Sequence, residues 1–272
     1  MKNKISLAGD LGSGKSTVSA LLVEALSLRY YSTGAIVRSL AQKHGMSVAD
    51  FNIYMETHPE IDREIDDGLV ALGREDKPMI IDSRMAWHFA GDTYRVYLSA
   101  DAETSAARIM SANRTGEHAA TLEETVAETK KRRQSEKKRY LSQYGVDIKD
   151  MNNYDLVVDT TSITPVRAAE VIREGFARWQ DGDVSKKLFL SPERLWFPDE
   201  SPDAQTVAAL SSALERGEPV PPVEVTEEDG EFYIVVGAAS ALAQALLMTD
   251  LIPATLTSGQ RTGAYVRMKN SL

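Results

Sequence analysis

The sequence predicts an α/β protein with a parallel sheet, followed by a smaller α+β unit. Over roughly the first 160 residues, short apolar runs alternate with amphipathic stretches, which is the pattern of βα units around a parallel sheet. A glycine-rich turn at residues 9–16 joins the first apolar run to the first amphipathic stretch. The composition changes after Trp179, since seven of the ten prolines lie beyond that residue. We therefore expect one unit at residues 1–180 and another at 186–272.

The first unit contains five predicted strands and seven predicted helices. The strands are short apolar runs, namely Ile5–Ala8, Arg29–Ser32, Met79–Asp82, Tyr94–Leu98 and Asp155–Val158. The helices carry apolar residues at helical spacing and are Lys15–Leu28, Ala35–His44, Ser47–Thr57, Glu60–Leu72, Ala102–Ala112, Leu122–Gln143 and a last helix that runs from Thr164-Pro165 to about Trp179.

The second unit follows a polar, glycine-containing link at residues 180–183. Asp229-Gly230 is a typical hairpin turn and is flanked by apolar runs. The predicted elements are a strand at Leu188–Leu190, a helix at Asp203–Arg216, the hairpin strands Val223–Thr226 and Glu231–Val236, a helix at Ala238–Leu247 and a strand near Ala254–Leu256.

Composition excludes several classes of protein. The chain of 272 residues has no cysteine, so it has no disulfide, no thiolate zinc site, no iron–sulfur cluster and no cysteine nucleophile. Its 31 Lys+Arg and 40 Asp+Glu give a net charge of −9, which opposes generic binding to nucleic acid or anionic membranes. The N-terminus lacks a signal-peptide pattern, and the longest apolar stretch, residues 235–248, is too short to span a bilayer. We expect a soluble, cytoplasmic protein without nucleic-acid or membrane partners.

Residues 9–16 read Gly-Asp-Leu-Gly-Ser-Gly-Lys-Ser, a complete G-x-x-x-x-G-K-S between a predicted strand and a predicted helix. Such a loop points backbone N–H groups at phosphates, the lysine adds a cation, and the serine is placed to hold Mg²⁺. The alternative is a glycine-rich turn with an exposed lysine. We expect ATP to be bound by Gly9, Asp10, Leu11, Gly12, Ser13, Gly14, Lys15, Ser16 and Thr17.

Two further segments are placed to bind an acceptor near this loop. The second strand leads into Ser32-Thr33-Gly34, and Arg38 follows one turn into the next helix. The third strand ends at Asp82, which Arg84 follows closely. An acidic side chain at that position can orient the waters of a bound Mg²⁺, so Ser16 and Asp82 are the predicted metal site. The alternative for Asp82 is ordinary strand termination.

With these motifs in hand, residues 1 to about 178 resemble the nucleoside monophosphate kinases, and most closely the short cytidylate kinases of the archaeal type. The segments at 131–140, 144–148 and 154–160 are similar to that family's lid-to-last-strand signature. The resemblance implies a P-loop NTPase fold with a five-stranded parallel sheet, flanking helices, a monophosphate-binding segment at about 32–77 and a mobile lid around 112–134.

The resemblance also implies that the γ-phosphoryl group of ATP is transferred to CMP or dCMP with Mg²⁺ present. Such a reaction brings two anions together, so it needs arginines from several segments. The implied catalytic residues are Lys15, Arg84, Arg133 and Arg139. Those implied for ATP beyond the loop are Arg108 and Arg114. Those implied for the acceptor are Ser32, Gly34, Arg38, Asp82, Arg84, Asp147 and Asp155, of which Asp147 and Asp155 would orient arginines or the base.

The basic run at 130–139 can point only one helical face into a cleft. The family pattern favours the face of Arg132, Arg133, Glu136 and Arg139 over that of Lys131, Ser135 and Lys138. The alternative is a solvated basic face. Asp10-Leu11 stands where the family commonly has proline. We expect the extra carboxylate of Asp10 to weaken ATP affinity unless it points to solvent.

The second unit resembles the ParB/sulfiredoxin-type fold in its segments at 188–195, 217–225 and 229–237. In that superfamily the glycine after the strand is commonly followed by an arginine-containing motif. Here Gly237 is followed by Ala-Ala-Ser, so the superfamily's nucleotide chemistry is not carried over. A structural or partner-binding module, including self-association, and an intact ligand site both remain open. From Lys186 onward 7 Lys+Arg face 12 Asp+Glu, which disfavours DNA partitioning.

The leading hypothesis is therefore a nucleoside monophosphate kinase that acts on CMP or dCMP. One alternative is a kinase for another small acceptor, such as a modified nucleotide. Another is a sensor or adaptor that binds ATP without turnover. Arg38 and Arg84 favour chemistry, because a sensor does not need arginines on the acceptor side.

Overall fold

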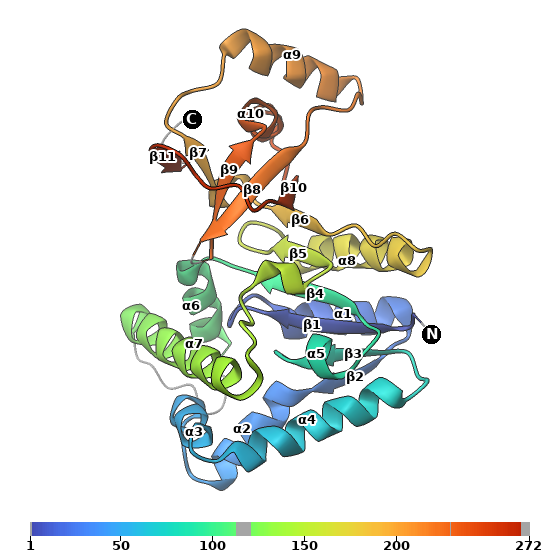
Figure 1. The fold of residues 1–272 in the computed structure, drawn as a ribbon, viewed down its shortest axis with the longest axis vertical. Helices are drawn as coiled ribbons and strands as arrows, with labels where there is room; N and C mark the ends of the chain where they lie inside the picture. The colour runs from blue at the N-terminus through green and yellow to red at the C-terminus, as the bar shows by residue number, and fades with distance from the viewer. Residues whose placement is uncertain (1, 113–120, 229, 268–272) are drawn as a thin grey trace.

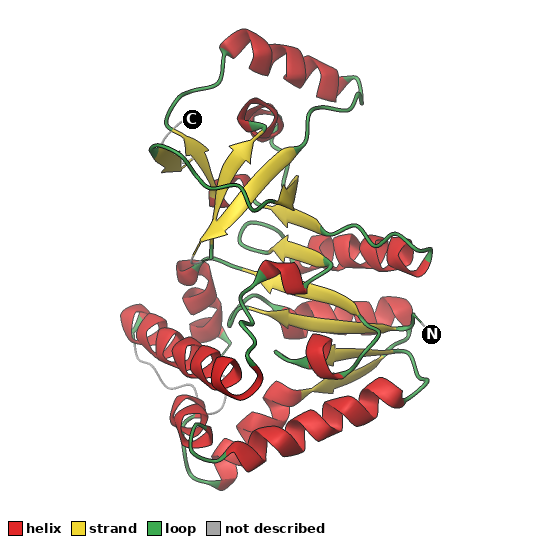
Figure 2. Cartoon of the chain, viewed as in Figure 1, coloured by secondary structure: helices red, strands yellow, loops and turns green. Residues whose placement is uncertain are grey.

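A computed structural model describes residues 2–112, 121–228 and 230–267, and one continuous sheet runs through both halves of the chain (Figure 1). The strand order in the described part is β11-β7-β9-β8-β10-β6-β5-β4-β1-β3-β2. Helices flank the N-terminal part of this sheet (Figure 2). No helix in the described ranges is both long enough and apolar enough to cross a membrane.

The N-terminal strands form the predicted five-stranded parallel sheet, in the order β2-β3-β1-β4-β5. Their bounds agree with the predicted ones to within one residue: β1 (Lys4–Gly9), β2 (Arg29–Ser32), β3 (Met79–Asp82), β4 (Tyr94–Ser99) and β5 (Leu156–Asp159). Because the strands are parallel, the loops that follow them meet at one edge of the sheet. The glycine-rich turn and Asp82 both lie at that edge.

The seven predicted helices of this half are confirmed to within two residues. They are α1 (Lys15–Leu26), α2 (Thr33–Lys43), α3 (Val48–Met55), α4 (Pro59–Arg74), α6 (Ala102–Ser111), α7 (Leu122–Tyr144) and α8 (Pro165–Gln180). The long α7 begins with a capping box, in which Thr121 and Glu124 satisfy each other's backbone N–H groups. One further helix, α5 (Ala86–Phe89), has four residues and is too short to show a helical period.

The C-terminal part adds its strands to the same sheet. β6 (Lys187–Leu190) pairs in parallel with β5, and β10 (Ile252–Leu256) pairs in antiparallel with β6. The predicted hairpin is present as β8 (Val223–Glu228) and β9 (Glu231–Val236), and both predicted helices are present as α9 (Ala204–Glu215) and α10 (Ala238–Leu246). Besides α5, the elements that were not predicted are η1 (Met151–Asn153) in the N-terminal half, and η2 (Pro192–Arg194), β7 (Leu195–Pro198) and β11 (Tyr265–Arg267) in the C-terminal part.

The two parts also share a hydrophobic core. One buried cluster joins Tyr97 and Val157 of the N-terminal half to Leu188, Val225 and Ile252 of the C-terminal half. A second cluster packs α1 and α8 against the N-terminal strands. The division at residues 1–180 and 186–272 stays a prediction, but burial of this shared core ties the two parts together.

Candidate functional site

The glycine-rich loop between β1 and α1 has the backbone shape that an anion site needs. Gly12 and Gly14 adopt φ angles of +78° and +82°, a region that favours glycine. A Cβ at Gly12 would lie 2.3 Å from the carbonyl oxygen of Ser105, so a side chain does not fit there. No side chain caps the start of α1. The first N–H groups of this helix are therefore available to phosphate oxygens.

Lys15 is folded over this loop. Its Nζ donates to the carbonyl oxygens of Gly9, at 2.9 Å, and Asp10, at 2.7 Å. Burial, together with the positive charge of Arg84, lowers the pKa of Lys15 to about 7. Phosphate oxygens carry full charge and are stronger acceptors than these carbonyls, so a bound phosphate stabilises the charged lysine.

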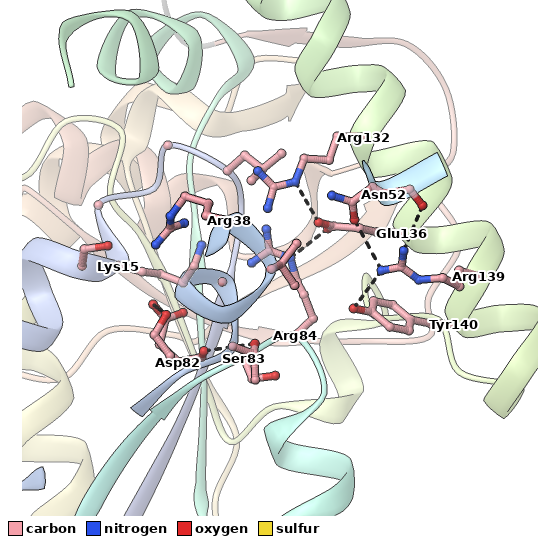
Figure 3. A pocket seen from close by; sticks show the side chains of 18 residues that line it. Lys15, Arg38, Asn52, Asp82, Ser83, Arg84, Arg132, Glu136, Arg139 and Tyr140 are labelled. Carbon is pink, nitrogen blue, oxygen red and sulfur yellow. Dashed lines mark hydrogen bonds and ion pairs between the residues drawn. The ribbon is translucent and has the colours of Figure 1, made fainter. Parts of the chain in front are cut away.

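A cavity opens beside Lys15, and we call it the front cavity (Figure 3). It is enclosed by the loop, the start of α2, the end of β3, α3 and one face of α7. Its lining residues are Leu11, Gly12, Gly14, Lys15, Ser16, Ser32, Thr33, Gly34, Val37, Arg38, Asn52, Asp82, Ser83, Arg84, Arg132, Glu136, Arg139 and Tyr140.

Glu136 holds two arginines in this cavity. Its carboxylate accepts from Arg84 Nε at 2.9 Å and from Arg132 Nε at 3.1 Å. Burial alone would raise the pKa of Glu136, but the two guanidinium groups lower it to about 2. The hydrogen bond of Arg84 uses Nε, and its terminal nitrogens have no hydrogen bond or ion pair among the described residues. Arg84 is thus fixed in position with donors left for a ligand.

Arg38 and Asp82 lie on the loop side of the same cavity (Figure 3). Asp82 accepts from the Tyr30 hydroxyl at 2.8 Å, which orients its carboxylate. Ser32 accepts from the N–H of Ala35 and caps α2, the helix that carries Arg38. In the described part of the chain, Arg38 has no hydrogen bond or ion pair to a protein group.

Arg139 belongs to the wall of the front cavity. Its side chain is 3% exposed, and its Nε lies 2.9 Å from Asp62 of α4. Its Nη1 donates to the carbonyl oxygen of Asn52 in α3 at 3.0 Å. Arg139 therefore ties α7 to α3 and α4, while its predicted part in catalysis stays a prediction.

A second cavity, which we call the side cavity, lies on the other flank of the loop. Arg108 contributes to it and donates to the carbonyl oxygen of Thr160 at 2.7 Å. Thr17, Ile163 and Ala168 are among its other lining residues. The position of Arg108 fits the predicted ATP side. Arg114 lies outside the described residues, as do residues 113–120 of the predicted lid at 112–134.

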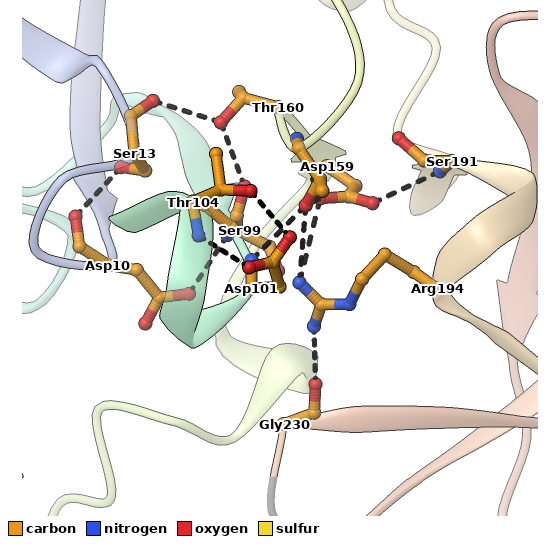
Figure 4. Close-up of polar contacts among 12 residues, drawn as sticks. Asp10, Ser13, Ser99, Asp101, Thr104, Asp159, Thr160, Ser191, Arg194 and Gly230 are labelled. Atoms are coloured by element: carbon orange, nitrogen blue, oxygen red, sulfur yellow. Dashed lines mark hydrogen bonds and ion pairs between the residues drawn. The ribbon is translucent and has the colours of Figure 1, made fainter. Parts of the chain in front are cut away.

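A buried polar network connects the side cavity to the C-terminal part (Figure 4). The Thr160 hydroxyl lies 3.0 Å from the carbonyl oxygen of Ser13 in the loop. The neighbouring Asp159 is fully buried, accepts from the backbone N–H of Ser191 and lies 3.7 Å from Arg194 Nη1. The C-terminal part therefore holds a segment that contacts the phosphate loop.

A third cavity, the back cavity, adjoins the Arg84–Glu136 pair and is not lined by Lys15. Both of these residues line the front and the back cavity, whereas Asp10, Arg133 and Asp147 line only the back one. Arg133 was predicted beside the transferring group, but α7 turns it away from the front cavity and toward Asp10. Likewise Asp147 pairs with Lys137, at 3.0 Å, and does not line the predicted acceptor site.

The expectation for Asp10 also needs correction. Its carboxylate points neither to solvent nor into the front cavity: it is buried and accepts from the Tyr97 hydroxyl at 3.0 Å and from the N–H of Ala100. Lys149 and Arg133 supply positive charge and hold the pKa of Asp10 well below its usual range, although burial opposes this. Its charge is thus compensated by protein groups, which removes the reason to expect weakened ATP affinity.

Asp155 lies at the wrong edge of the sheet for an acceptor-binding residue. It precedes β5, at the amino end of the strands, whereas the loop follows the carboxyl end of β1. Its carboxylate accepts from the backbone N–H, Nε and Nη2 of Arg95 at 2.9, 3.1 and 2.8 Å. The predicted role beside the base does not match this position.

Sequence reasoning gave no specific role to several residues of the site. Arg132 and Glu136 were placed on the favoured face of α7, and their spacing of four residues was the available signal for an ion pair. Asn52, Tyr140, Thr160 and Lys149 reach the cavities through contacts that are distant in sequence. No local pattern marks them.

The donor set of the predicted metal site fits Mg²⁺. Ser16 and Asp82 line the same cavity and supply a hydroxyl and a carboxylate oxygen. Mg²⁺ prefers oxygen ligands, keeps several waters and usually takes only one or two protein carboxylates beside substrate phosphates. Within the described residues, no group of three or more His, Asp or Glu side chains forms a separate metal site.

The chain is similar to known nucleotide kinases. A family model described as cytidylate kinase-like family matches residues 4–162. The cytidylate kinase of Thermoplasma acidophilum is 35% identical over 196 residues, which cover 71% of this chain and 99% of that one. The cytidylate kinase of Archaeoglobus fulgidus is 34% identical over 170 residues, which cover 62% of this chain and 92% of that one.

Another relative has a different name. An S-adenosylmethionine-dependent nucleotide dehydratase of Lacinutrix mariniflava is 33% identical over 199 residues, which cover 73% of this chain and only 40% of that protein. Among solved structures, a shikimate kinase of Acinetobacter baumannii in complex with shikimate superimposes with a TM-score of 0.43 at 16% identity, over 67% of this chain and 96% of that one. A sulfiredoxin of Arabidopsis thaliana gives 0.25 at 24% identity over 27% and 85%. These superpositions are too loose to carry a functional argument.

Proposed function

The chain belongs to the cytidylate kinase-like family, and from that premise we propose that it transfers the γ-phosphoryl group of ATP to CMP or dCMP. The observation that carries the proposal is the front cavity, where Lys15, Arg38 and Arg84 surround one space beside the phosphate loop. In this account residues 1–180 carry the reaction, and residues 186–272 form an appended ParB/sulfiredoxin-like unit. We also propose that this C-terminal unit binds a protein partner or a second copy of the chain.

The charges of the site suit the transfer of a phosphoryl group between two anions. ATP and the monophosphate repel each other, so the reaction is accelerated mainly by positioning and by fixed positive charge. Lys15 and the start of α1 hold the β- and γ-phosphates. Arg38 and Arg84, on the acceptor side, bind the phosphate that attacks. Two anions are thus held in line without the protein supplying a covalent step.

Arg84 is able to do this because Glu136 fixes it before the substrate arrives. A pre-positioned guanidinium does not need to reorganise as charge develops in the transition state. The same carboxylate holds Arg132, so two cations are aligned along the α7 side of the cavity. Glu136 is a positioning residue in this account.

Mg²⁺ bound with ATP would supply positive charge that neutralises the phosphate oxygens. Ser16 would contact the ion directly and Asp82 through water. The contact between Tyr30 and Asp82 keeps this carboxylate oriented toward the loop side of the cavity.

Support for cytosine comes from the cytidylate kinase relatives, at 34–35% identity over most of their length. The dehydratase relative favours a second candidate, a kinase for another nucleotide, including a modified one. A coupled assay of ADP release over a panel of nucleoside and deoxynucleoside monophosphates separates them. The leading proposal expects CMP and dCMP to give the highest kcat/KM, and a preference for another base supports the second candidate.

The sensor hypothesis is less well supported by the site. A protein that only senses ATP has no use for Arg38 and a pre-positioned Arg84 on the acceptor side of the loop. If no monophosphate stimulates ADP release while ATP still binds, the kinase proposal is wrong and the sensor hypothesis replaces it.

A further inference from the structure

The back cavity contains groups that the proposed reaction does not use. It lies between the phosphate loop, α7 and the segment at 147–150 on one side, and Arg194 with the β8–β9 hairpin on the other. Its walls therefore come from both parts of the chain. Lys15, Ser16 and Asp82 line the front cavity but not this one.

Arg133 has buried donors without acceptors in this cavity. Its Nε and Nη2 are buried and make no hydrogen bond. Nη2 lies 3.4 Å from Asp10, close enough for an ion pair but without hydrogen-bond geometry. Buried polar groups are almost always hydrogen-bonded, so two such nitrogens on one guanidinium indicate a missing acceptor.

The carboxylates around the cavity are not that acceptor, since each already has protein partners. Asp10 binds Tyr97, Ala100 and Lys149, and Asp147 binds Lys137 and the N–H of Lys149. The others have partners as well: Asp101 with Thr104, Glu136 with Arg84, Asp150 with Asn152, Glu227 with Gly230 and Glu231 with Trp196. Arg133 therefore keeps hydrogen-bond donors that no protein group of the cavity uses.

The charged groups that line the cavity with Arg133 indicate the charge of the missing anion. Lys130 lies one turn before Arg133 on the same face of α7 and lines the same cavity, as does Lys149. The full lining holds six Lys/Arg and seven Asp/Glu, but Arg133 and Lys149 share the single carboxylate of Asp10, and Lys130 adds a third positive charge to this group. A dianion would balance these three cations and Asp10. Lys149 and Arg133 hold the pKa of the buried Asp10 well below its usual range, although burial opposes this shift.

We propose that the back cavity binds a phosphate-type dianion, either free phosphate or the phosphate group of a small metabolite, through Arg133, Lys149 and Lys130. The back cavity shares Leu11, Arg84 and Glu136 with the front cavity, but Arg133, Lys149 and Lys130 line neither the front nor the side cavity. The site requires both parts of the chain because Arg194 closes one wall. Arg194 is 4% exposed and donates to the carbonyl oxygen of Gly230 at 2.7 Å, which fixes that wall. The proposal does not depend on which nucleotide is phosphorylated.

Equilibrium dialysis of the full chain with radiolabelled inorganic phosphate tests the site. Phosphate also binds the other two sites, so the test compares variants. Arg133→Gln and Lys130→Gln should each weaken one binding component, Arg133→Gln by about tenfold or more. Lys138→Gln is the matched control on α7, because Lys138 is 74% exposed and pairs with Glu56, away from the cavity. It should bind as the unmodified chain does.

Arg38→Gln separates this site from the acceptor site, since it should spare the component that Arg133→Gln removes. A competition with ribose 5-phosphate identifies the source of the dianion. Displacement at lower concentration than inorganic phosphate supports a phosphorylated metabolite, and equal or weaker displacement supports free phosphate. If the isotherms of Arg133→Gln and Lys130→Gln both superimpose on that of the unmodified chain, the proposal is wrong.

Discussion

Arg194 of the C-terminal part reaches Asp159 at the end of β5, with Nη1 3.7 Å from Oδ1 and both residues almost fully buried. The next residue, Thr160, contacts the phosphate loop at Ser13 and accepts at its carbonyl from Arg108. A buried carboxylate without a compensating cation is costly. The C-terminal part is therefore joined to the segment that contacts the phosphate loop by a charge pair as well as by the shared core.

Replacing Arg194 tests this connection. Arg194→Met should destabilise the chain by about 3 kcal/mol, because it leaves Asp159 buried without its cation. The KM for ATP should rise more than kcat falls, since the segment that contacts the loop loses its support. Urea unfolding and ATP kinetics measure the two effects. Arg216→Met is the control, because the Arg216 side chain is 58% exposed and forms an ion pair with the exposed Glu218. Equal behaviour of the two variants would contradict the connection.

ATP binding should take up protons at pH 8. In the free protein the pKa of Lys15 is about 7, so the lysine is mostly neutral at that pH. Bound phosphates favour the charged form and raise this pKa, and a proton is then taken from solution. Calorimetry in Tris and in HEPES, whose ionisation enthalpies differ, measures the uptake. Lys15→Met should abolish it. Identical binding enthalpies in both buffers would show that Lys15 is already charged.

Arg84 should matter for the acceptor more than for ATP. Arg84→Ala removes a charge-assisted contact to the acceptor phosphate and should lower kcat/KM for CMP about 10- to 100-fold. Steady-state kinetics with each substrate varied in turn will show whether the KM for ATP changes much less. Arg63→Ala, at an exposed position of α4, serves as the control. Unchanged CMP kinetics in the Arg84 variant would refute the acceptor site.

Glu136 should make stability depend on acidic pH. Its folded pKa is about 2, below the ordinary glutamate pKa of 4.5, so its stabilising contribution is fully present above about pH 4.5 and is lost as pH falls toward 2. Urea unfolding of Glu136→Gln should show a smaller loss of stability across this window. A parallel fall in both proteins would mean that the Glu136 pairs do not stabilise the fold.

The sequence predicts the elements of this fold well where they bury apolar residues in long regular patterns. The five parallel strands and the helices around them follow from such patterns. The one-turn helix α5 and the strands β7 and β11 are too short to show a period, and their pairing depends on distant partners. For example, Trp196 of β7 faces Tyr233 of β9.

The site is predictable only where the chemistry is local. Lys15 and Ser16 follow from one contiguous motif. Whether Arg132 or Arg133 faces the front cavity depends on the rotation of α7, which contacts with α3 and α4 decide. The orientation of Asp10 depends on Tyr97 and Lys149, which are 87 and 139 residues away. Asp155 could have been placed better from sequence, since a residue that precedes a parallel strand lies at the edge opposite the loop.

The central claim is that a phosphoryl group is transferred to CMP in the front cavity. The most direct measurement is ADP release from ATP and Mg²⁺ with and without CMP, using the full chain and its Lys15→Ala variant. We predict that CMP strongly stimulates ADP release, that CDP forms in equal amount, and that Lys15→Ala abolishes both while the protein stays folded. If ATP binds but neither CMP nor any other nucleoside monophosphate stimulates ADP release, the proposed function is contradicted.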